Sequence, residues 1–458
     1  MRELPELHRA ALEIFNRALG SVDAAEAVRQ AVRLEGSRLL IHETVIDLAE
    51  RRAGIYSIGI GKAAPLMAAA LDEILGDYLT AGFFSGPFKN LAHPFLPPRR
   101  FSTRWRWCEG GHPLPNKASL RAAQSAFELL RQADDEGALI IFLISGGGSA
   151  MIEWPRHEQT TLEELQEANR ILVSCGATIA EINSVRRAFS AVKGGGLAAR
   201  APRAEQISLI VSDTNTGEET NVASGPTFEP PRSAPDAAEV VSRYKLGAML
   251  PASILRAIER PAISRAAKTG QGLRRHYVLL DNGSAMEAAA VVARAAGFRV
   301  EMARDLVEQP IAEGCSELLL RLSNLRRRTK LSSTVCLVSG GEFACPVKGV
   351  GTGGRNSETA LRCAIESDRF FQRGASGASP LAQAVFLSAG TDGVDGNSPA
   401  AGALADETTL ARARAMNLDA QKFLDESDAY TFFHKLGDAI ITGPTGTNVR
   451  DLRIMLAS

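Results

Sequence analysis

Two short apolar runs of this chain end in the same three residues, Ser-Gly-Gly. The first is A-L-I-I-F-L-I-S-G-G-G-S-A at residues 138–150, and the second is T-V-C-L-V-S-G-G-E at residues 334–342. A short, uniformly apolar run is typical of a strand that is buried on both faces, and the glycines predict a loop with bare backbone amides at its end. Such amides, ahead of a helix, can bind phosphate or carboxylate. The repetition therefore predicts two α/β domains that face a common anionic ligand.

Predicted strands and helices alternate along the chain, which favours mostly parallel sheets with helices on both faces. Residues 183–196 read as a helix with a glycine cap, and residues 343–348 read as a short strand. Five prolines between residues 226 and 251 suggest a linker. We therefore expect two α/β/α domains, a Rossmann-like one at residues 1–235 and a second at residues 236–458, with the active site in the cleft between them.

Composition limits the partners of this chain. Lys plus Arg and Asp plus Glu each number 52 among 458 residues, so no overall field attracts nucleic acid or a membrane surface. The apolar run at residues 138–144 is too short to span a bilayer. Six scattered cysteines form no Cys-x-x-Cys pair, which argues against a disulfide scaffold and favours a reducing cytoplasm. We expect a cytoplasmic globular protein with small-molecule substrates and leave a homodimer open.

Polar residues stand where the predicted strands end, and ligands of open α/β sheets bind at those ends. A transferred phosphoryl group spreads negative charge over its oxygens in the transition state, so its enzyme supplies cations, metal ligands and hydrogen-bond donors. The strand ends offer that chemistry. The residues are Lys62, Ser145, Ser149, Asp213, Glu342, Arg355, Asn356, Asp392 and Asp395.

Two cations stand out among them. Lys62 lies in G-I-G-K-A-A, between a buried strand and an apolar helix, and these flanks favour a functional lysine over a solvated one. Arg355 follows glycines and precedes a helix, where its planar fork can hold carboxylate or phosphate. Asn183 and Arg186 lie three residues apart on one helix face, where they can hold a small polar substrate or join an exposed network.

The aspartates have two interpretations. Asp213 can cap a turn or bind Mg²⁺, and both interpretations stay open. Asp392 and Asp395 lie in T-D-G-V-D-G, and we favour a functional role for Asp392 and a turn-forming role for Asp395.

The run G-I-G-K-A-A also matches the dinucleotide fingerprint G-x-G-x-x-A, which requires an acidic residue at the end of the next strand. That strand, G-F-F-S-G-P-F, ends at Ser85 and Pro87 without a carboxylate, and this argues against NAD. The P-loop pattern G-x-x-x-x-G-K-S/T is absent from the sequence.

Eight motifs in order resemble the glycerate 2-kinase family, the glycerate kinases with a MOFRL C-terminal domain, whose relatives are often labelled hydroxypyruvate reductase. They are G-I-G-K-A-A-P-L-M, G-G-H-P-L-P-N-K-A-S-L, L-I-S-G-G-G-S-A, N-S-V-R-R-A-F-S-A-V-K-G-G, V-A-S-G-P-T, V-S-G-G-E, G-G-R-N and L-S-A-G-T-D-G-V-D-G. The resemblance covers nearly the whole chain and places the MOFRL region at about residues 332–450.

The resemblance implies transfer of the γ-phosphoryl group of ATP to the 2-hydroxyl of D-glycerate, with Mg²⁺. It implies Lys62 and Arg355 as catalytic cations, with Asp213 and Asp392 as catalytic or metal-binding carboxylates. The substrate and nucleotide residues that we expect are Gly61, Ser145, Gly146, Gly147, Gly148, Ser149, Asn183, Arg186, Gly340, Gly341, Glu342, Gly354 and Asn356.

Residues 214–219 read T-N-T-G-E-E, where relatives usually carry a Gly-Asp-Asp-like run. Glu218 and Glu219 are candidates for the same role. Two alternatives stay open: an NAD(P)H-dependent hydroxypyruvate reductase, and a non-catalytic relative that binds a nucleotide or sugar acid.

Overall fold

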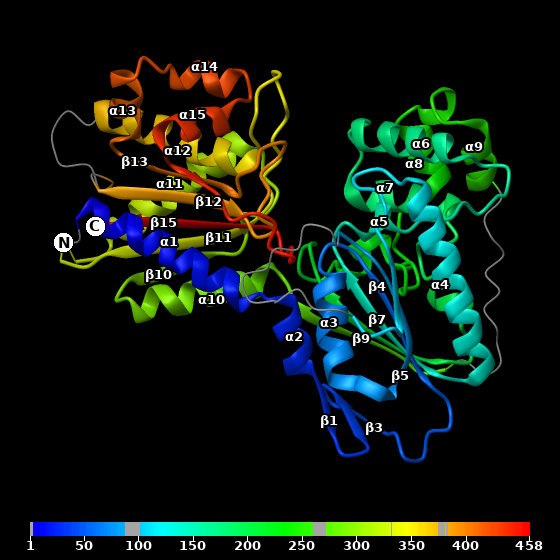
Figure 1. Cartoon of the computed structure of the whole chain (residues 1–458). Helices are drawn as coiled ribbons and strands as arrows, with labels where there is room; N and C mark the ends of the chain where they lie inside the picture. The colour runs from blue at the N-terminus through cyan, green and yellow to red at the C-terminus, as the bar shows by residue number, and fades with distance from the viewer. Residues whose placement is uncertain (1–2, 88–100, 260–271, 331, 374–380, 382) are drawn as a thin grey trace. The chain divides into compact units, whose positions relative to one another are not determined.

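The computed structural model describes residues 3–87, 101–259, 272–330, 332–373, 381 and 383–458. The chain divides into two compact units (Figure 1). The N-terminal unit is Ala24–Leu280, and the C-terminal unit combines Met1–Asp23 with Asp281–Ser458.

This division differs from the boundary that we expected after residue 235. Strand β9 (Arg274–Leu280) pairs in parallel with β8 (Glu205–Val211), so the proline-rich segment lies inside the N-terminal unit and does not connect the two units. The first helix, α1 (Leu4–Ser21), buries Leu7 and Phe15 in the core of the C-terminal unit. Prolines and chain order therefore mislead here, because the contacts that define each unit are remote in sequence.

Six of the described strands form the sheet of the N-terminal unit, all of them parallel. The spatial order is β6-β5-β4-β7-β8-β9, which is the Rossmann order 3-2-1-4-5-6, and it confirms the Rossmann-like prediction. The strands not yet given are β4 (Ile55–Ile60), β5 (Leu79–Ser85), β6 (Trp105–Cys108) and β7 (Leu139–Ser145). The direction of the strand order reverses between β4 and β7, where such folds bind ligands.

Helices cover both faces of this sheet. Tyr56, Ile58 and Ile60 of β4 share a core with the apolar face of α4 (Lys117–Glu136). Successive strand residues point to opposite faces, and Gly59 lies against Ala64 of α3 (Ala64–Leu75). The α/β/α arrangement is therefore confirmed for this unit.

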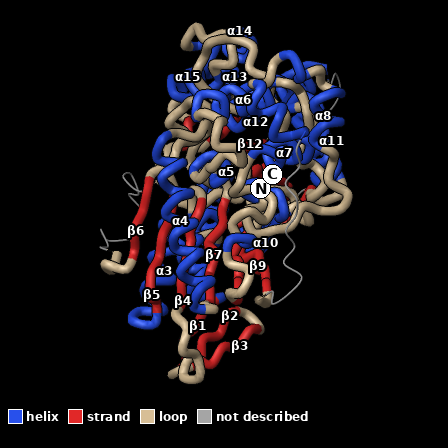
Figure 2. The backbone as a smooth tube through the Cα atoms, turned by 90° about the vertical axis from the view of Figure 1, so that its right-hand side faces the viewer, coloured by secondary structure: helices blue, strands red, loops and turns tan. Residues whose placement is uncertain are grey.

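The N-terminal unit has further elements outside this sheet, and Figure 2 colours helices blue and strands red. Helix α7 ends at Phe189 and not at the glycines of the predicted cap, because Ser190 turns into a bridge with Pro155. The three-stranded antiparallel sheet that follows α2 was not predicted. The elements are α2 (Ala24–Ala31), β1 (Val32–Glu35), β2 (Arg38–Ile41), β3 (Thr44–Asp47), η1 (Gly76–Tyr78), α5 (Gly148–Met151), α6 (Leu162–Ser174), α7 (Ile179–Phe189), η2 (Ala198–Arg200), η3 (Glu219–Ser224), α8 (Ala237–Arg243), η4 (Leu246–Ala248) and α9 (Ala252–Glu259).

The sheet of the C-terminal unit has the order β10-β11-β15-β12-β13-β14. Among its described pairs, β10 and β11 are the one parallel pair, so the prediction of a mostly parallel sheet is wrong here. The last strand, β15, lies between β11 and β12 and runs antiparallel to both, and β13 runs antiparallel to β12 and β14. The bounds are β10 (Arg299–Ala303), β11 (Val335–Gly341), β12 (Ala384–Gly390), β13 (Gly402–Asp406), β14 (Ala439–Ile440) and β15 (Asp451–Ala457).

Alternate residues of these strands fill two cores. Cys336, Val338 and Ile454 pack with α1 and α10, whereas Leu337 and Met455 pack with α11 and α12. This unit is therefore also a three-layer α/β/α structure. The predicted strand at residues 343–348 is replaced by one bridge between Ala344 and Pro310. The helices are α10 (Asn282–Ala295), α11 (Ile311–Arg327), α12 (Arg355–Arg373), α13 (Thr409–Ala415), α14 (Ala420–Asp425) and α15 (Ala429–Leu436).

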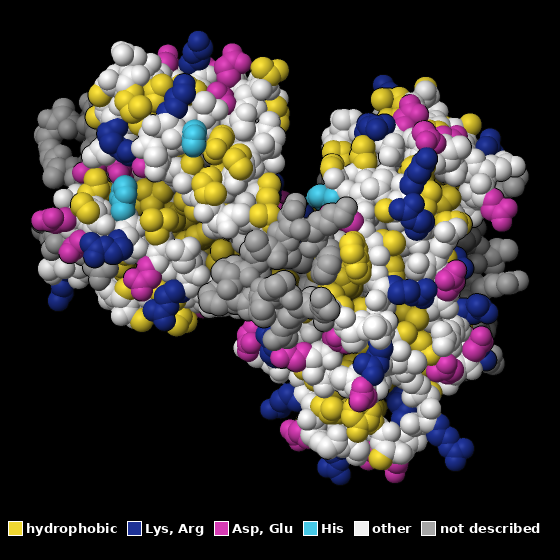
Figure 3. Space-filling view, viewed as in Figure 1, with side chains coloured by type: hydrophobic (Ala, Val, Ile, Leu, Met, Phe, Trp, Pro, Cys, Tyr) yellow, Lys and Arg dark blue, Asp and Glu magenta, His cyan; other side chains and the backbone are white. Residues whose placement is uncertain are grey.

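Two further observations concern the distribution of charge on the surface and the hydropathy of the helices. Positive and negative side chains are interspersed on the face that Figure 3 shows. Among the residues that the structure describes, we find no helix whose length and hydropathy would let it cross a bilayer.

Candidate functional site

Lys62 lies at the switch point of the Rossmann-like sheet, directly after β4. Its backbone N–H donates to the Gly146 carbonyl at 2.9 Å, and the Ala63 N–H donates to Ser145 Oγ at 3.0 Å. Gly61 has a φ of +111°, and a Cβ there would overlap the Ser145 carbonyl. The turn that carries Lys62 is therefore fixed against the first Ser-Gly-Gly loop.

The glycines of this loop leave room for two functional side chains. A Cβ on Gly146 would overlap Asp213 Oδ2, and a Cβ on Gly147 would lie 3.2 Å from Lys62 Cγ. Asp213 itself follows β8, two strands from β4 in the sheet. The structure thus brings together Lys62, Asp213 and the loop, although they are up to 151 residues apart in the sequence (213 − 62).

A chain of hydrogen bonds extends from the end of the loop. Ser149 Oγ lies 3.0 Å from Ser224 Oγ, which donates to Asn183 Oδ1 at 2.8 Å. Ser224 was not among the predicted site residues, although it lies in the motif V-A-S-G-P-T. Its φ of +62° follows a φ of +51° at Ala223, an uncommon pair of left-handed non-glycine residues. Such backbone outliers persist where the surroundings hold them, often at functional sites.

Arg186 and Asn183 share helix α7 but have different partners. Arg186 Nε donates to Asn169 Oδ1 at 2.8 Å, and burial lowers the pKa of Arg186 while the charge of Glu153 opposes that change. The arginine nearer to Ser224 is Arg187, whose Nε donates to the Ser224 carbonyl at 3.5 Å. The structure therefore joins Asn183 to the serine chain and does not place Arg186 in it.

A buried ion pair lies beside these elements and was missed from the sequence. Lys193 and Glu153 contact each other, with 1% and 0% of their side chains exposed. Glu153 Oε1 also accepts from Ser190 Oγ at 2.5 Å and from the Trp154 N–H at 2.9 Å. Burial lowers the pKa of Lys193, and the charge and hydrogen bond of Glu153 oppose that change. The lysine in the motif A-V-K-G-G-G was the available signal.

In the C-terminal unit, Arg355 begins α12 between two carboxylates. Its Nε donates to Asp451 Oδ2 at 2.6 Å, and its Nη2 lies 2.8 Å from Glu342 Oε1. Burial lowers the pKa of Arg355, but the charges of Asp451 and Glu342 outweigh it and the pKa stands above its ordinary value. Glu342 and Arg355 were predicted, whereas Asp451 was not.

Asn356, next to Arg355, forms hydrogen bonds through its side chain and through its backbone N–H. Its Nδ2 donates to Asp451 Oδ1 at 2.8 Å, its Oδ1 accepts from Ser388 Oγ at 2.7 Å, and its backbone N–H donates to Asp395 Oδ1 at 2.8 Å. Asp395 also accepts from the backbone N–H and the hydroxyl of Ser357. Burial raises the pKa of Asp395, and these hydrogen bonds oppose the increase. Asp395 therefore caps the start of α12.

The remaining predicted residues of this unit lie close by. Gly354 packs against Asp395, where a Cβ would overlap the carboxylate. Asp392 is half-buried, and its Oδ1 accepts from the Val394 N–H at 3.1 Å.

The second Ser-Gly-Gly run differs from the first and corrects our expectation of two equivalent loops. Gly340 and Gly341 belong to β11 and pair with Leu452 and Asp451 of β15. Buried Arg453 donates to the carbonyls of both glycines. The same three residues therefore end a strand in one copy and continue it in the other, because only the second copy has an antiparallel neighbour at this point.

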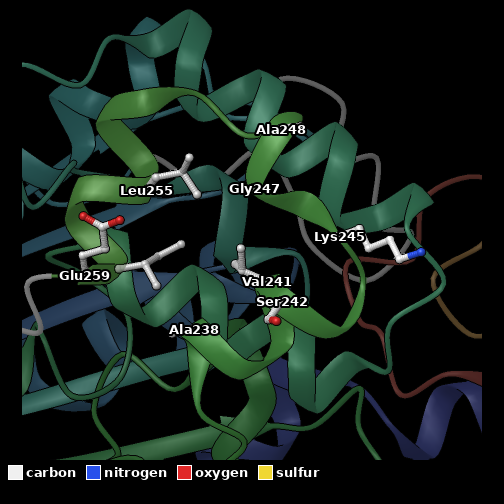
Figure 4. A pocket seen from close by; sticks show the side chains of 9 residues that line it. Ala238, Val241, Ser242, Lys245, Gly247, Ala248, Leu255 and Glu259 are labelled. Carbon is white, nitrogen blue, oxygen red and sulfur yellow. The ribbon is translucent and has the colours of Figure 1, made fainter.

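A surface pocket of ≈ 580 Å³ lies apart from all predicted site residues (Figure 4). Elements α8, η4 and α9 form it, and side chains such as Val241, Leu255 and Ile258 line it. The charged residues of its lining are Lys245 and Glu259, and none of the cations or carboxylates discussed above lines it.

Comparison with known proteins places the chain in a family. Residues 10–259 match a family described as a domain of unknown function, DUF4147, and residues 335–451 match the MOFRL family. The chain is 33% identical to a glycerate kinase of Rattus norvegicus (98% of this chain, 93% of that protein) and 31% identical to a D-glycerate 2-kinase of Thermotoga maritima (98% of each). The crystal structure of a glycerate kinase from Thermotoga maritima is similar, with a TM-score of 0.77 and 30% identity over 99% of this chain and 100% of that one. With the Rossmann-like switch point and the MOFRL match in place, the chain belongs to the glycerate kinase family.

Proposed function

We propose that this protein is a D-glycerate 2-kinase, which transfers the γ-phosphoryl group of ATP to the 2-hydroxyl of D-glycerate and forms 2-phosphoglycerate and ADP. The observation that carries the proposal is the position of Lys62 at the switch point, against a glycine loop that it shares with Asp213. Relatives that carry the names glycerate kinase and D-glycerate 2-kinase over nearly the full length support the choice of substrate.

In the proposed reaction the 2-hydroxyl oxygen attacks the γ-phosphorus, and the bond from that phosphorus to the bridging oxygen of ADP breaks. Negative charge grows on the transferred group and on the leaving oxygen, so cations lower the barrier. Lys62 and Arg355 are the cations that we assign. At about 4 Å and an effective dielectric near 20, one such contact contributes roughly 4 kcal/mol before desolvation.

The loop between Ser145 and Ser149 is suited to oxygen-rich ligands, because its glycines admit a ligand close to the backbone. Ser149, Ser224 and Asn183 form a polar chain beside it, which we assign to substrate or nucleotide binding. The hydroxyl proton leaves to a carboxylate, for which Asp213 is our candidate.

Mg²⁺ fits the oxygen donors that are present. Asp213 lies against the bare backbone of Gly146, and Mg²⁺ usually binds proteins through one or two carboxylates plus substrate phosphates. Asp213 and Asp392 are the residues that we propose to hold the ion. When bound, it would neutralise phosphate charge.

We place the protein in the cytoplasm, in line with six cysteines that are all free thiols. This location suits an enzyme that draws on cellular ATP.

The test is a discontinuous assay of purified protein with ATP, Mg²⁺ and D-glycerate. Adding enolase without phosphoglycerate mutase distinguishes the products, because only 2-phosphoglycerate is dehydrated directly. We expect ADP and 2-phosphoglycerate in equal amounts. Oxidation of NAD(P)H with hydroxypyruvate would support the reductase alternative, and nucleotide binding without ADP release would support the non-catalytic one.

A further inference from the structure

We propose that Asp451 is a positioning residue for the phosphoryl transfer, because one carboxylate holds both Arg355 and Asn356 at the start of α12. This inference rests on the proposed function, since it gains its meaning from Arg355 acting as a catalytic cation. The role falls on a residue of the last strand that lies outside every motif discussed above.

The backbone of Asp451 is fixed from both sides. It is the first residue of β15, paired with Gly341 of β11 on one side and with Gly390 of β12 on the other. The residue is 3% exposed. Its carboxylate therefore has a defined place at the end of the sheet where α12 begins.

The two oxygens of this carboxylate have separate partners. Oδ2 accepts from Arg355 Nε at 2.6 Å, and Oδ1 accepts from Asn356 Nδ2 at 2.8 Å. Glu342 Oε1 lies 2.8 Å from Arg355 Nη2. Because Nε and Nη2 are both held, the plane of the guanidinium is fixed and its Nη1 keeps a set direction.

Arg453 ties the supporting strands together. It lies two residues after Asp451 and therefore on the same face of β15. Its guanidinium donates to Gly341 O at 3.0 Å and to Ser339 Oγ at 3.1 Å, and it stacks at 3.6 Å on the ring of Phe343. Glu342 lies between Gly341 and Phe343, so the two carboxylates that flank Arg355 share one rigid support.

Asp451 is not the cap of α12, since Asp395 accepts the hydrogen bonds of the first helical N–H groups. Arg355 is 36% exposed at its side chain, so water can solvate it when its partner is removed. Loss of Asp451 should therefore misorient the guanidinium more than it unfolds the helix.

The experiment compares kcat and KM of the full-length protein with Asp451→Asn, Arg355→Ala and the double variant. We expect Asp451→Asn to lower kcat about 100-fold, which is the order of effect of a misplacement near 1 Å. The KM values for ATP and for D-glycerate should stay within about threefold of those of wild type. The double variant should be no slower than Arg355→Ala, because two residues that act as one unit are not additive. Losses that multiply would overturn the positioning role.

Chemical rescue gives a readout that a purely structural role would not move. Free guanidinium should restore part of the activity of Arg355→Ala, because the carboxylates of Asp451 and Glu342 remain to hold it. It should restore none in the double variant. Equal rescue of both variants would contradict the proposal.

Two further variants keep the test decisive. Asp451→Glu retains the charge but moves it by one methylene, so it should also lose kcat, and full activity of this variant would overturn the role even if Asp451→Asn does not fold. Asp406→Asn is the matched control. The carboxylate of Asp406 is also buried and contacts a basic side chain, that of His8, but the residue lies in β13 opposite Val385, at the other end of the sheet from Asp451. Its kcat should match wild type. If Arg355→Ala keeps wild-type kcat, the assignment of Arg355 fails instead, and the two failures are thus distinguished.

Discussion

The buried pair of Lys193 and Glu153 allows a quantitative prediction about the N-terminal unit. Glu153→Gln keeps the shape of the side chain and leaves Lys193 in the interior without its countercharge. Removing one partner of a buried pair usually costs about 3–5 kcal/mol of folding free energy. Glu153 and Lys193 are 0% and 1% exposed at their side chains, so little solvent screening reduces this cost. We expect a loss of that size at pH 7.

The pH dependence follows from the lysine. Burial lowers the pKa of Lys193 in the folded state, with Glu153 opposing, so removing Glu153 lowers that pKa further below the unfolded value. Between the folded and unfolded pKa values the unfolded chain binds more protons, and stability rises with pH. Wild type gains stability in the same way only above its own, less depressed folded pKa, so the loss caused by Glu153→Gln should shrink as the pH rises above 7 and become constant below about 10, the ordinary pKa of lysine.

Tryptophan fluorescence during urea unfolding measures this unit selectively. The three tryptophans, Trp105, Trp107 and Trp154, all lie in the N-terminal unit, and Trp154 is bonded to Glu153 itself. The double variant Glu153→Gln/Lys193→Met is the control and should be more stable than Glu153→Gln alone, because no charge is left buried. A loss below about 1 kcal/mol at pH 7, or a loss that does not change with pH, would show that Glu153 does not compensate a buried charge on Lys193.

Two further predictions concern other parts of the molecule. Gly146→Ala places a Cβ on the Asp213 carboxylate and should lower kcat at least about 10-fold. Gly247→Ala, with open space at its Cβ, is the control and should leave kcat unchanged. Equal activity of the two variants would contradict the close contact between Gly146 and Asp213. For Asp406, burial raises the pKa, but hydrogen bonds from His8 and Thr408 outweigh it and lower the pKa to about 2. Its stabilisation is present above the unfolded pKa near 4 and is lost as the pH falls towards 2, so Asp406→Asn should destabilise the protein by about 2 kcal/mol at pH 7 and by little at pH 2 in circular-dichroism melts. A loss that is the same at both pH values would argue against this interpretation.

The Rossmann-like unit was predictable because its signals are local. Its central strands β4, β7 and β8 are largely apolar runs that end at or just before a glycine or polar residue. Parallel strands joined by helices also leave few possible topologies. Lys62, Ser145 and Asp213 each stand at such a strand end, so the topology alone brings them to one edge of the sheet.

The C-terminal unit was less predictable because β15 pairs with strands that precede it by 61 residues or more (451 − 390). A strand inserted antiparallel between β11 and β12 leaves no local mark in D-L-R-I-M-L-A. For the same reason the carboxylate that holds Arg355 could not be found, since Asp451 lies far from every motif that predicted the site. The Ser-Gly-Gly repeat misled in its second copy because a glycine pattern does not reveal whether a neighbouring strand continues to pair with it.

The role of Lys62 in a D-glycerate 2-kinase is measured by the initial rate of 2-phosphoglycerate formation by wild type and by Lys62→Ala, with ATP, Mg²⁺ and D-glycerate. A lysine contact near 4 kcal/mol corresponds to about a 10³-fold change in rate. We therefore expect active wild type and a Lys62→Ala variant that is folded by circular dichroism but slower by about that factor. Wild-type turnover in the folded variant would contradict the catalytic role of Lys62, and a wild type that forms no 2-phosphoglycerate would contradict the proposed kinase activity.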